Sequence, residues 1–170
     1  MKKLHKNKKG FTLVELIVVL VILGILIAML VPALTGYIDK ANKQKAQAQA
    51  KMLLTAAQTM GMEEYQALQD AGINPGDGRL LGLGPVVANT GDGFSKLRPY
   101  GAAATEPTLE ALAEIKGKYA LGGTKGKGTS VTWDVSGKVT DIVYTTKDKK
   151  YQAVYAAPVD GKATWTVKKI

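Results

Sequence analysis

The 170-residue sequence contains no cysteine, and its only histidine is His5. Without cysteine the chain has no disulfide bond, no thiol nucleophile and no cysteine-ligated zinc. A lone histidine beside the N-terminus leaves no Ser-His-Asp set and little scope for acid–base catalysis by histidine. The composition therefore argues against an enzyme, and we expect no catalytic residue, no metal site and no cofactor.

Acidic residues are also scarce, because 14 Asp and Glu stand against 23 Lys and Arg and the net charge is +9. Residues 1–10 contain five lysines and no acid, residues 11–115 are mildly acidic, and residues 116–170 are basic again. The basic C-terminal part has three interpretations: a solvated surface, a surface that pairs with the acidic part of another copy, or a surface that attracts DNA or anionic surface polymers.

A long uncharged segment separates Glu15 from Asp39, and its part Leu16–Leu34 is apolar almost throughout. A helix of this length rises about 28 Å, close to the roughly 30 Å of a bilayer's hydrocarbon core. The preceding lysines predict that the N-terminus stays in the cytoplasm and that the remaining chain is exported. A secretory signal peptide is an alternative, although its apolar region is usually only about 7–15 residues long. A plain single-pass anchor is the other alternative.

The entrance to the apolar segment has a distinctive order: two lysines, then Gly10, Phe11, Thr12, Leu13, Val14 and Glu15. From about Lys8 to Ala41 the chain resembles the type IV pilin family. In that family a prepilin peptidase cuts after the glycine and methylates the new terminal amine. The resemblance therefore implies that Gly10 ends a leader and that Phe11 is the first, methylated residue of the mature chain.

Glu15 has two interpretations, since an ionised carboxylate inside a membrane helix costs about 2.5–3.5 kcal/mol without a partner. Thr12 and Glu15 fit a capping box, which needs no second chain. Alternatively, cleavage would create a charged amine on Phe11, four residues before Glu15 and about 6 Å away along the helix axis, with which the carboxylate could pair. The resemblance favours pairing of Glu15 with this amine on a neighbouring subunit during assembly.

Two further residues of the resemblance, Gly24 and Pro32, lie inside the apolar helix. Proline lacks a backbone N–H and crowds the preceding turn, so Pro32 is expected to bend or locally open the helix. By resemblance, the stretch between Gly24 and Pro32 loosens in an assembled filament. A static kink at Pro32 and a close-packing site at Gly24 are the alternatives.

The predicted fold is α+β, with a long N-terminal helix packed against a four-stranded antiparallel sheet. Three parts are expected: a leader at 1–10, a transmembrane and filament-core helix at 11–38, and a globular head at 39–170. The helix continues past Met52 to a stop at Gly72, with an interruption at Gly61. Its predicted core stripe consists of Ile38, Ala41, Ala48, Met52, Leu53, Ala56, Ala57 and Met60.

The remaining chain predicts a loop, a short helix and the sheet. Residues 72–100 are rich in glycine and proline and read as turns. Calcium is an alternative there because Asp77 and Asp92 offer carboxylates, although two are few for this ion. A helix is expected at 108–116 with Pro107 in its first turn. Strands are expected at 131–135, 139–146, 151–156 and 164–167, with Trp133 and Trp165 in the core.

The predicted function is that of a structural subunit of a type IV pilus, held in the cytoplasmic membrane and then assembled into an extracellular filament. The partners that the resemblance implies are copies of the chain itself, a prepilin peptidase, an assembly ATPase and an inner-membrane platform protein. A pseudopilin of a type II secretion or DNA-uptake system is the first alternative. A membrane-anchored surface binding module is the second.

Leader cleavage yields the first testable prediction. Mass spectrometry of the chain isolated from its native cells should find a mature N-terminus at methylated Phe11. A leader that is still attached, or a terminus that begins after Ala33, would contradict the prepilin interpretation.

Overall fold

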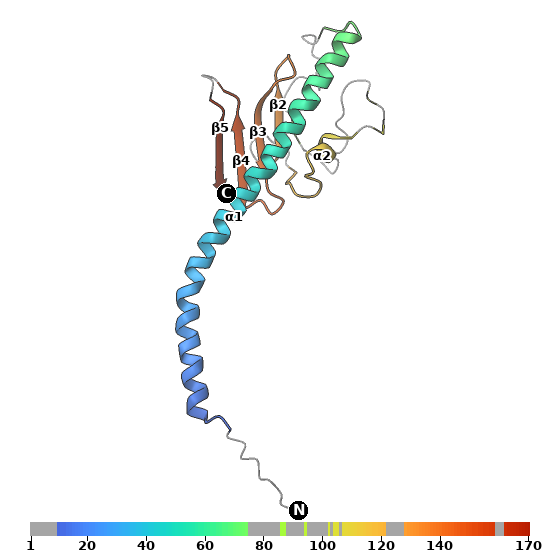
Figure 1. Ribbon diagram of the computed structural model, residues 1–170. Coiled ribbons are helices and arrows are strands. Elements are labelled where there is room, and N and C mark those ends of the chain that lie inside the picture. The colour runs from blue at the N-terminus through green and yellow to red at the C-terminus, as the bar shows by residue number, and fades with distance from the viewer. Residues whose placement is uncertain are drawn as a thin grey trace, which may run out of the picture. The chain divides into compact units, whose positions relative to one another are not determined.

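The structure, a computed structural model, describes residues 10–74, 86–87, 94, 102, 104–105, 107–121, 128–158 and 162–170. Helix α1 (Leu13–Asp70) is followed by strand β1 (Val86–Val87), helix α2 (Leu109–Leu112) and strands β2 (Ser130–Trp133), β3 (Val139–Thr145), β4 (Tyr151–Ala156) and β5 (Thr164–Lys169) (Figure 1). The chain divides into two compact units, Met1–Lys40 and Ala41–Ile170. We call the second unit the head.

The head contains one antiparallel sheet in the order β1-β2-β3-β4-β5. Strands β2 to β5 form the predicted four-stranded meander, and the expected strand at 151–156 has the same bounds in the structure. The two-residue strand β1 was not predicted and pairs with the edge of β2. The α+β class predicted from the sequence is thus confirmed.

One face of the sheet packs on the second half of α1 (Figure 1). The prediction of the buried face of α1 was right for its second half and wrong for its first half. Leu53, Ala56, Ala57 and Met60 are buried as predicted. The other predicted residues are exposed: Ile38, Ala41, Ala48 and Met52. The face actually buried consists of Ala46, Gln49, Ala50, Leu53, Ala56, Ala57, Met60, Gly61, Glu64 and Leu68. Its small residues allow the helix backbone to approach the sheet closely.

A close approach occurs at Gly61, which the sequence predicted as a helix interruption but which lies within continuous α1. A Cβ added to Gly61 would meet Cδ1 of Trp133 at 2.7 Å and would collide with the carbonyl of Gly137. The Trp133 indole also donates a 2.8 Å hydrogen bond to the Ala57 carbonyl. Gly61 is therefore a packing residue, and Trp133 is in the core as expected, whereas Trp165 is half-buried.

The turn between β2 and β3 fixes this contact. Gly137 has a φ of 78°, a conformation that favours glycine. Oδ1 of Asp134 accepts hydrogen bonds from the Ser136 and Lys138 backbone amides at 2.9 and 3.0 Å. Partial burial acts to raise the pKa of Asp134, but these bonds and the one from the Ser136 hydroxyl outweigh it and lower the pKa.

The predicted end of α1 is confirmed. Gly72 has a φ of 67°, its amide donates to the Gln69 carbonyl, and the next amide, of Ile73, donates to the Leu68 carbonyl. This is a Schellman motif, the cap that glycine favours after a helix.

The second helix is shorter than expected, because α2 covers four residues rather than 108–116. Its N-cap is Thr108, whose hydroxyl accepts from the Ala111 amide, so Pro107 lies before the helix rather than in its first turn. Glu114, at a φ of 51°, departs from helical geometry and stops the helix early. Asp77 and Asp92, the carboxylates of the calcium alternative, lie outside the described residues.

The Gly61 contact yields a prediction about stability. Gly61→Ala should lower the free energy of unfolding by about 1–3 kcal/mol, because the new methyl group overpacks the contact with Trp133 and the β2–β3 turn. Thermal unfolding of the full chain in detergent would measure this change. Gly36→Ala is the matched control, since a Cβ at Gly36 meets no atom within 4 Å and should cause no loss.

Candidate functional site

The predicted processing bond lies in an accessible part of the chain. Gly10 and Phe11 precede α1, both are exposed, and the Phe11 side chain keeps 84% of its surface open. A Cβ at Gly10 would meet no atom within 4 Å. A peptidase can therefore reach the bond between Gly10 and Phe11 without first unfolding a helix.

Thr12 and Glu15 form the predicted capping box at the start of α1. Oε2 of Glu15 accepts 2.8 Å hydrogen bonds from both the backbone amide and the hydroxyl of Thr12. In return, the Glu15 amide donates to the Thr12 hydroxyl at 3.3 Å. The capping interpretation is thus confirmed within a single chain. Glu15 remains exposed, which leaves its carboxylate accessible to a second subunit.

The first part of α1 exposes an unbroken apolar surface. Its large side chains from Leu13 to Ile38 each keep about half or more of their surface open. Among the described helices, α1 alone has a segment apolar enough to span a membrane, with a mean hydropathy of 3.2 and none of it buried. A soluble monomer rarely exposes so much contiguous apolar surface. This segment therefore requires lipid or other protein chains around it.

Gly24 and Pro32 both lie within this segment, and α1 is continuous through them. Of the two effects expected at Pro32, a bend or a local opening of the helix, the opening is absent from the single chain. The hydroxyl of Thr35 donates a 2.8 Å hydrogen bond to the Pro32 carbonyl, one turn later. A Cβ added at Gly24 would meet no other part of the described chain within 4 Å, so the small size of this residue serves no contact within one subunit.

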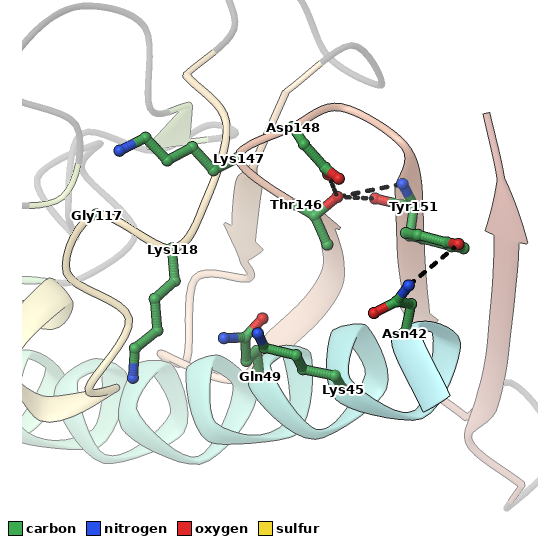
Figure 2. Close-up of a pocket in the computed structure, with 9 residues that line it drawn as sticks. All are labelled: Asn42, Lys45, Gln49, Gly117, Lys118, Thr146, Lys147, Asp148 and Tyr151. Atoms are coloured by element: carbon green, nitrogen blue, oxygen red, sulfur yellow. Dashed lines mark hydrogen bonds between the residues drawn. The ribbon is translucent and has the colours of Figure 1, made fainter. Parts of the chain in front are cut away.

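The head contains a cleft of about 410 Å³ between α1, the segment after α2 and the β3–β4 hairpin (Figure 2). Its lining residues are Asn42, Lys45, Gln49, Gly117, Lys118, Thr146, Lys147, Asp148 and Tyr151. The sequence did not predict this cleft, because the three segments are distant along the chain and carry no common motif. The only feature of the sequence that pointed to this cleft was the cluster of lysines at 147–150.

The floor of the cleft is tied to the core through Tyr144. Its buried hydroxyl lies 2.9 Å from Oε1 of Gln49 and 2.9 Å from the Lys118 carbonyl. The hydroxyl therefore donates to these two acceptor oxygens, and its single hydrogen is shared between them. Burial raises the pKa of Tyr144, which therefore stays neutral. These bonds connect α1, the loop after α2 and β3.

Asp148 is the one acidic side chain that lines the cleft, and it is held within its own hairpin. Its Oδ1 accepts a 2.6 Å hydrogen bond from the Thr146 hydroxyl and a 3.2 Å bond from the Lys150 amide. The hydroxyl bond and then the amide bond lower the pKa of Asp148. No group of three or more His, Asp or Glu side chains that could bind a metal occurs among the described residues.

Known proteins resemble the chain in its N-terminal motif and over most of its length. Residues 5–31 match the family described as the prokaryotic N-terminal methylation motif. The fimbrial protein EcpC of Eikenella corrodens is 30% identical over 141 residues, which are 78% of this chain and 85% of that protein. The type IV major fimbrial protein FimA of Dichelobacter nodosus is 29% identical over 150 residues, which are 85% of this chain and 93% of that protein.

A secretion protein is similar over a shorter stretch. The type II secretion system core protein G of Dickeya chrysanthemi is 51% identical over 43 residues, which are 25% of this chain and 28% of that protein. No solved structure matches the chain significantly.

A methylation motif that leads into an exposed apolar helix, with an α+β head behind it, defines a class of membrane-anchored filament proteins. Within this class, the chain belongs to the type IV pilin and pilin-like family. Its relatives support a pilus subunit as its function, with a secretion pseudopilin as the alternative. The family is structural, and the motif and apolar helix fit a membrane-anchored precursor and an extracellular pilus.

The Tyr144 hydrogen bonds yield a prediction about the head. Tyr144→Phe should lower the free energy of unfolding by about 1–3 kcal/mol, because it takes this partner from the buried Gln49 side chain and removes one of the two hydrogen bonds that the Lys118 carbonyl accepts. Chemical denaturation of the full chain in detergent would measure the loss. Tyr37→Phe is the control, because Tyr37 is 74% exposed and its substitution should change little. An equal effect of both substitutions would contradict the role of the buried bonds.

Proposed function

We propose that the chain is a structural subunit of a type IV pilus, cut between Gly10 and Phe11 and methylated on the Phe11 amine. The exposed apolar surface of α1 directly behind the methylation motif carries this proposal. Such a surface suits two environments in succession: lipid before assembly and the helices of neighbouring subunits afterwards. The role is mechanical, and no catalytic residue is assigned.

The topology of the precursor follows from its charges. The five leader lysines hold the N-terminus in the cytoplasm, and the head is exported across the membrane. Cleavage removes those lysines and leaves the Phe11 amine as the only cation at this end of the apolar segment. The mature helix is then easier to extract from the membrane, because it no longer carries five cations.

Glu15 selects the register in which subunits add to the filament. In the single chain its carboxylate is held by Thr12, which orients it at the helix start. In an assembly the methylated Phe11 amine of a neighbouring subunit is a stronger partner, because the pair is ionic and packing around it excludes water. An assembly ATPase and a membrane platform protein supply the work of extraction, and Gly24 and Pro32 permit local loosening of the packed helices.

A pseudopilin of a secretion or DNA-uptake system is the second candidate. The 51% identity to a type II secretion core protein G favours it, although over a quarter of the chain only. Both candidates use the same processing and the same helix. Electron microscopy of cells with and without this chain separates them, since a pilus subunit is required for surface filaments.

The proposed role of Glu15 yields a prediction that separates assembly from capping. Glu15→Ala should leave membrane insertion and leader cleavage intact but abolish filaments, because the charged partner of the Phe11 amine is gone. Filaments would be counted by electron microscopy, and cleavage would be followed by mass spectrometry.

Glu15→Gln is the sharper variant, since glutamine also completes a capping box but carries no charge. It should fail to polymerise as well. Thr12→Ala is the matched control, because it weakens the cap and keeps the carboxylate, and it should still form filaments. Normal filaments from Glu15→Gln would show that Glu15 acts through capping alone.

A further inference from the structure

One end of the head is strongly cationic. Six exposed lysines gather there from four segments, and we call this surface the cationic end: Lys45, Lys118, Lys147, Lys149, Lys150 and Lys168. The first three of them line the cleft of Figure 2. Neither the family membership nor the proposed polymerisation through the apolar part of α1 assigns a role to this surface.

The fold holds these segments beside one another. The Lys147 amide donates to the Lys118 carbonyl at 3.2 Å. The Asn42 side chain, on α1, reaches the Tyr151 hydroxyl at 3.5 Å. In the β4–β5 ladder Lys169 is opposite Tyr151, which brings the end of β5 to the same place. The lysines therefore share one surface because of backbone and side-chain contacts between their segments.

Acidic side chains offset little of this positive charge. Asp148 is engaged by the Thr146 hydroxyl and the Lys150 amide, as described above. Glu114 is exposed and precedes Lys118 by four residues, and the Lys118 ammonium donates to the Glu114 carbonyl at 2.8 Å. The cationic end thus keeps an excess of exposed ammonium groups, which suits a partner with exposed carboxylates.

The last turns of α1 carry the opposite charge. From residue 41 to residue 62 the helix has three lysines and no acid, whereas from residue 63 to residue 70 it has three acids and no base. Two of these acids, Glu63 and Asp70, are exposed. Their spacing of seven residues places them on one face of the helix, where the Gln66 amide donates to Oδ1 of Asp70 at 2.9 Å. We call Glu63, Gln66 and Asp70 the acidic stripe.

The stability of the helix does not explain the acidic stripe. The C-terminal end of a helix dipole favours cations, yet the last turn of α1 contains Asp70 and no basic residue. Beside Glu63 lies Met62, whose side chain is 70% exposed, more than any other large apolar side chain of the described head. Exposed carboxylates next to an exposed apolar side chain are typical of a surface that contacts another chain.

Within one head, the cationic end and the acidic stripe are too far apart to pair. Lys45 precedes Glu63 by 18 residues on a continuous helix, which is about 27 Å, and Asp70 is further still. The screening length at physiological ionic strength is only about 8 Å. Asp134 and Lys138, in the β2–β3 turn, carry opposite charges and leave this separation unchanged. The charges of the two surfaces can therefore pair only between copies.

We propose that the cationic end of one head binds the acidic stripe of a second copy. This inference rests on the proposed function in one respect, namely that copies of the chain assemble. The two surfaces are different patches of the same head, so the contact is heterologous and can repeat from copy to copy without closing. The flexible, apolar stems of the lysines suit contact with Met62 while their ammonium groups reach the carboxylates.

Specificity is the main consequence of this contact. A single exposed ion pair contributes little to stability, whereas matched charges select which surfaces meet and like charges oppose the wrong contacts. The burial of apolar helix surface supplies most of the free energy of assembly. The contact between heads then determines which neighbour each subunit accepts.

Carbodiimide cross-linking of filaments sheared from native cells tests this contact. The reagent joins a carboxylate directly to a lysine amine, so it links only groups that touch. Mass spectrometry should find the acids of the stripe joined to the lysines of the cleft, namely Lys45, Lys118 and Lys147. Salt at about 1 M should lower the yield about threefold or more, because it screens the charges.

The detergent-solubilised single chain is the control for cross-linking, and it should lack these products. Their presence in the single chain would show that they form within one head and would overturn the proposal. Cross-links of Glu63 and Asp70 to other lysines only would overturn it as well. Cross-links of the cleft lysines to a different protein would identify another partner, with the same consequence.

Charge reversal provides a second test. Glu63→Lys combined with Asp70→Lys should reduce the number of filaments about tenfold, because lysines then face lysines. Adding Lys45→Glu and Lys147→Glu should restore the number to within about twofold of the original, since the opposite charges meet again in exchanged places. Filament numbers that do not respond to the first pair of substitutions would contradict the contact.

A matched control separates this contact from net charge. It combines the two reversed acids with Lys51→Glu and Lys162→Glu, which change exposed lysines outside the cationic end and give the same net charge as the restoring set. The control should not restore filaments, and equal restoration by both sets would overturn the proposal. Thermal unfolding in detergent and leader cleavage would establish that each variant folds and is processed.

Failure of this inference is distinguishable from failure of the proposed function. Native cells that make no filament dependent on this chain would contradict both. Filaments that form but lack the cross-links and tolerate the charge reversal would contradict only the contact between heads.

Discussion

The apolar surface of the first part of α1 is the feature on which the rest of this protein depends. No described part of its own chain covers that surface, and every square ångström left in water costs about 25 cal/mol. The segment is therefore stable only in lipid or among other helices. A precursor held in the membrane and a filament packed through its helices are the two states that satisfy this constraint, and the methylation motif at its entrance marks the passage between them.

The head holds the other part of the same helix. Alanines and Gly61 bring the backbone of α1 close to the sheet, where the Trp133 indole and the Gly137 turn meet it. Close contact of this kind leaves little freedom to slide, because any added atom collides with backbone. A filament built on α1 therefore carries each head in a fixed relation to the helical segment from Ala46 to Leu68, which suits a protein whose role is mechanical.

Charged side chains have defined surroundings at two places along α1. Glu15 caps the start of α1 through Thr12, and it lies beside the residue whose amine cleavage would expose. Lys45, in the part of α1 that belongs to the head, lines a cleft together with Lys118 and Lys147. A single chain thus combines an uncharged apolar segment with a lysine-lined cleft in its head.

The sequence by itself determined the apolar segment, its capping box, the stop at Gly72 and the strand periods, because each depends on neighbouring residues and on local hydrogen bonds. It misplaced the buried stripe of α1, since alanine and methionine tolerate either face and only the sheet decides which one is covered. Gly61 was misread for the same reason: a glycine in a helix reads as a break until the Gly137 turn is found against it. The lysine cleft and the bond from Tyr144 to Gln49 were beyond prediction, because they join α1 to segments about 70 to 110 residues further along the chain, which only the tertiary structure brings into contact.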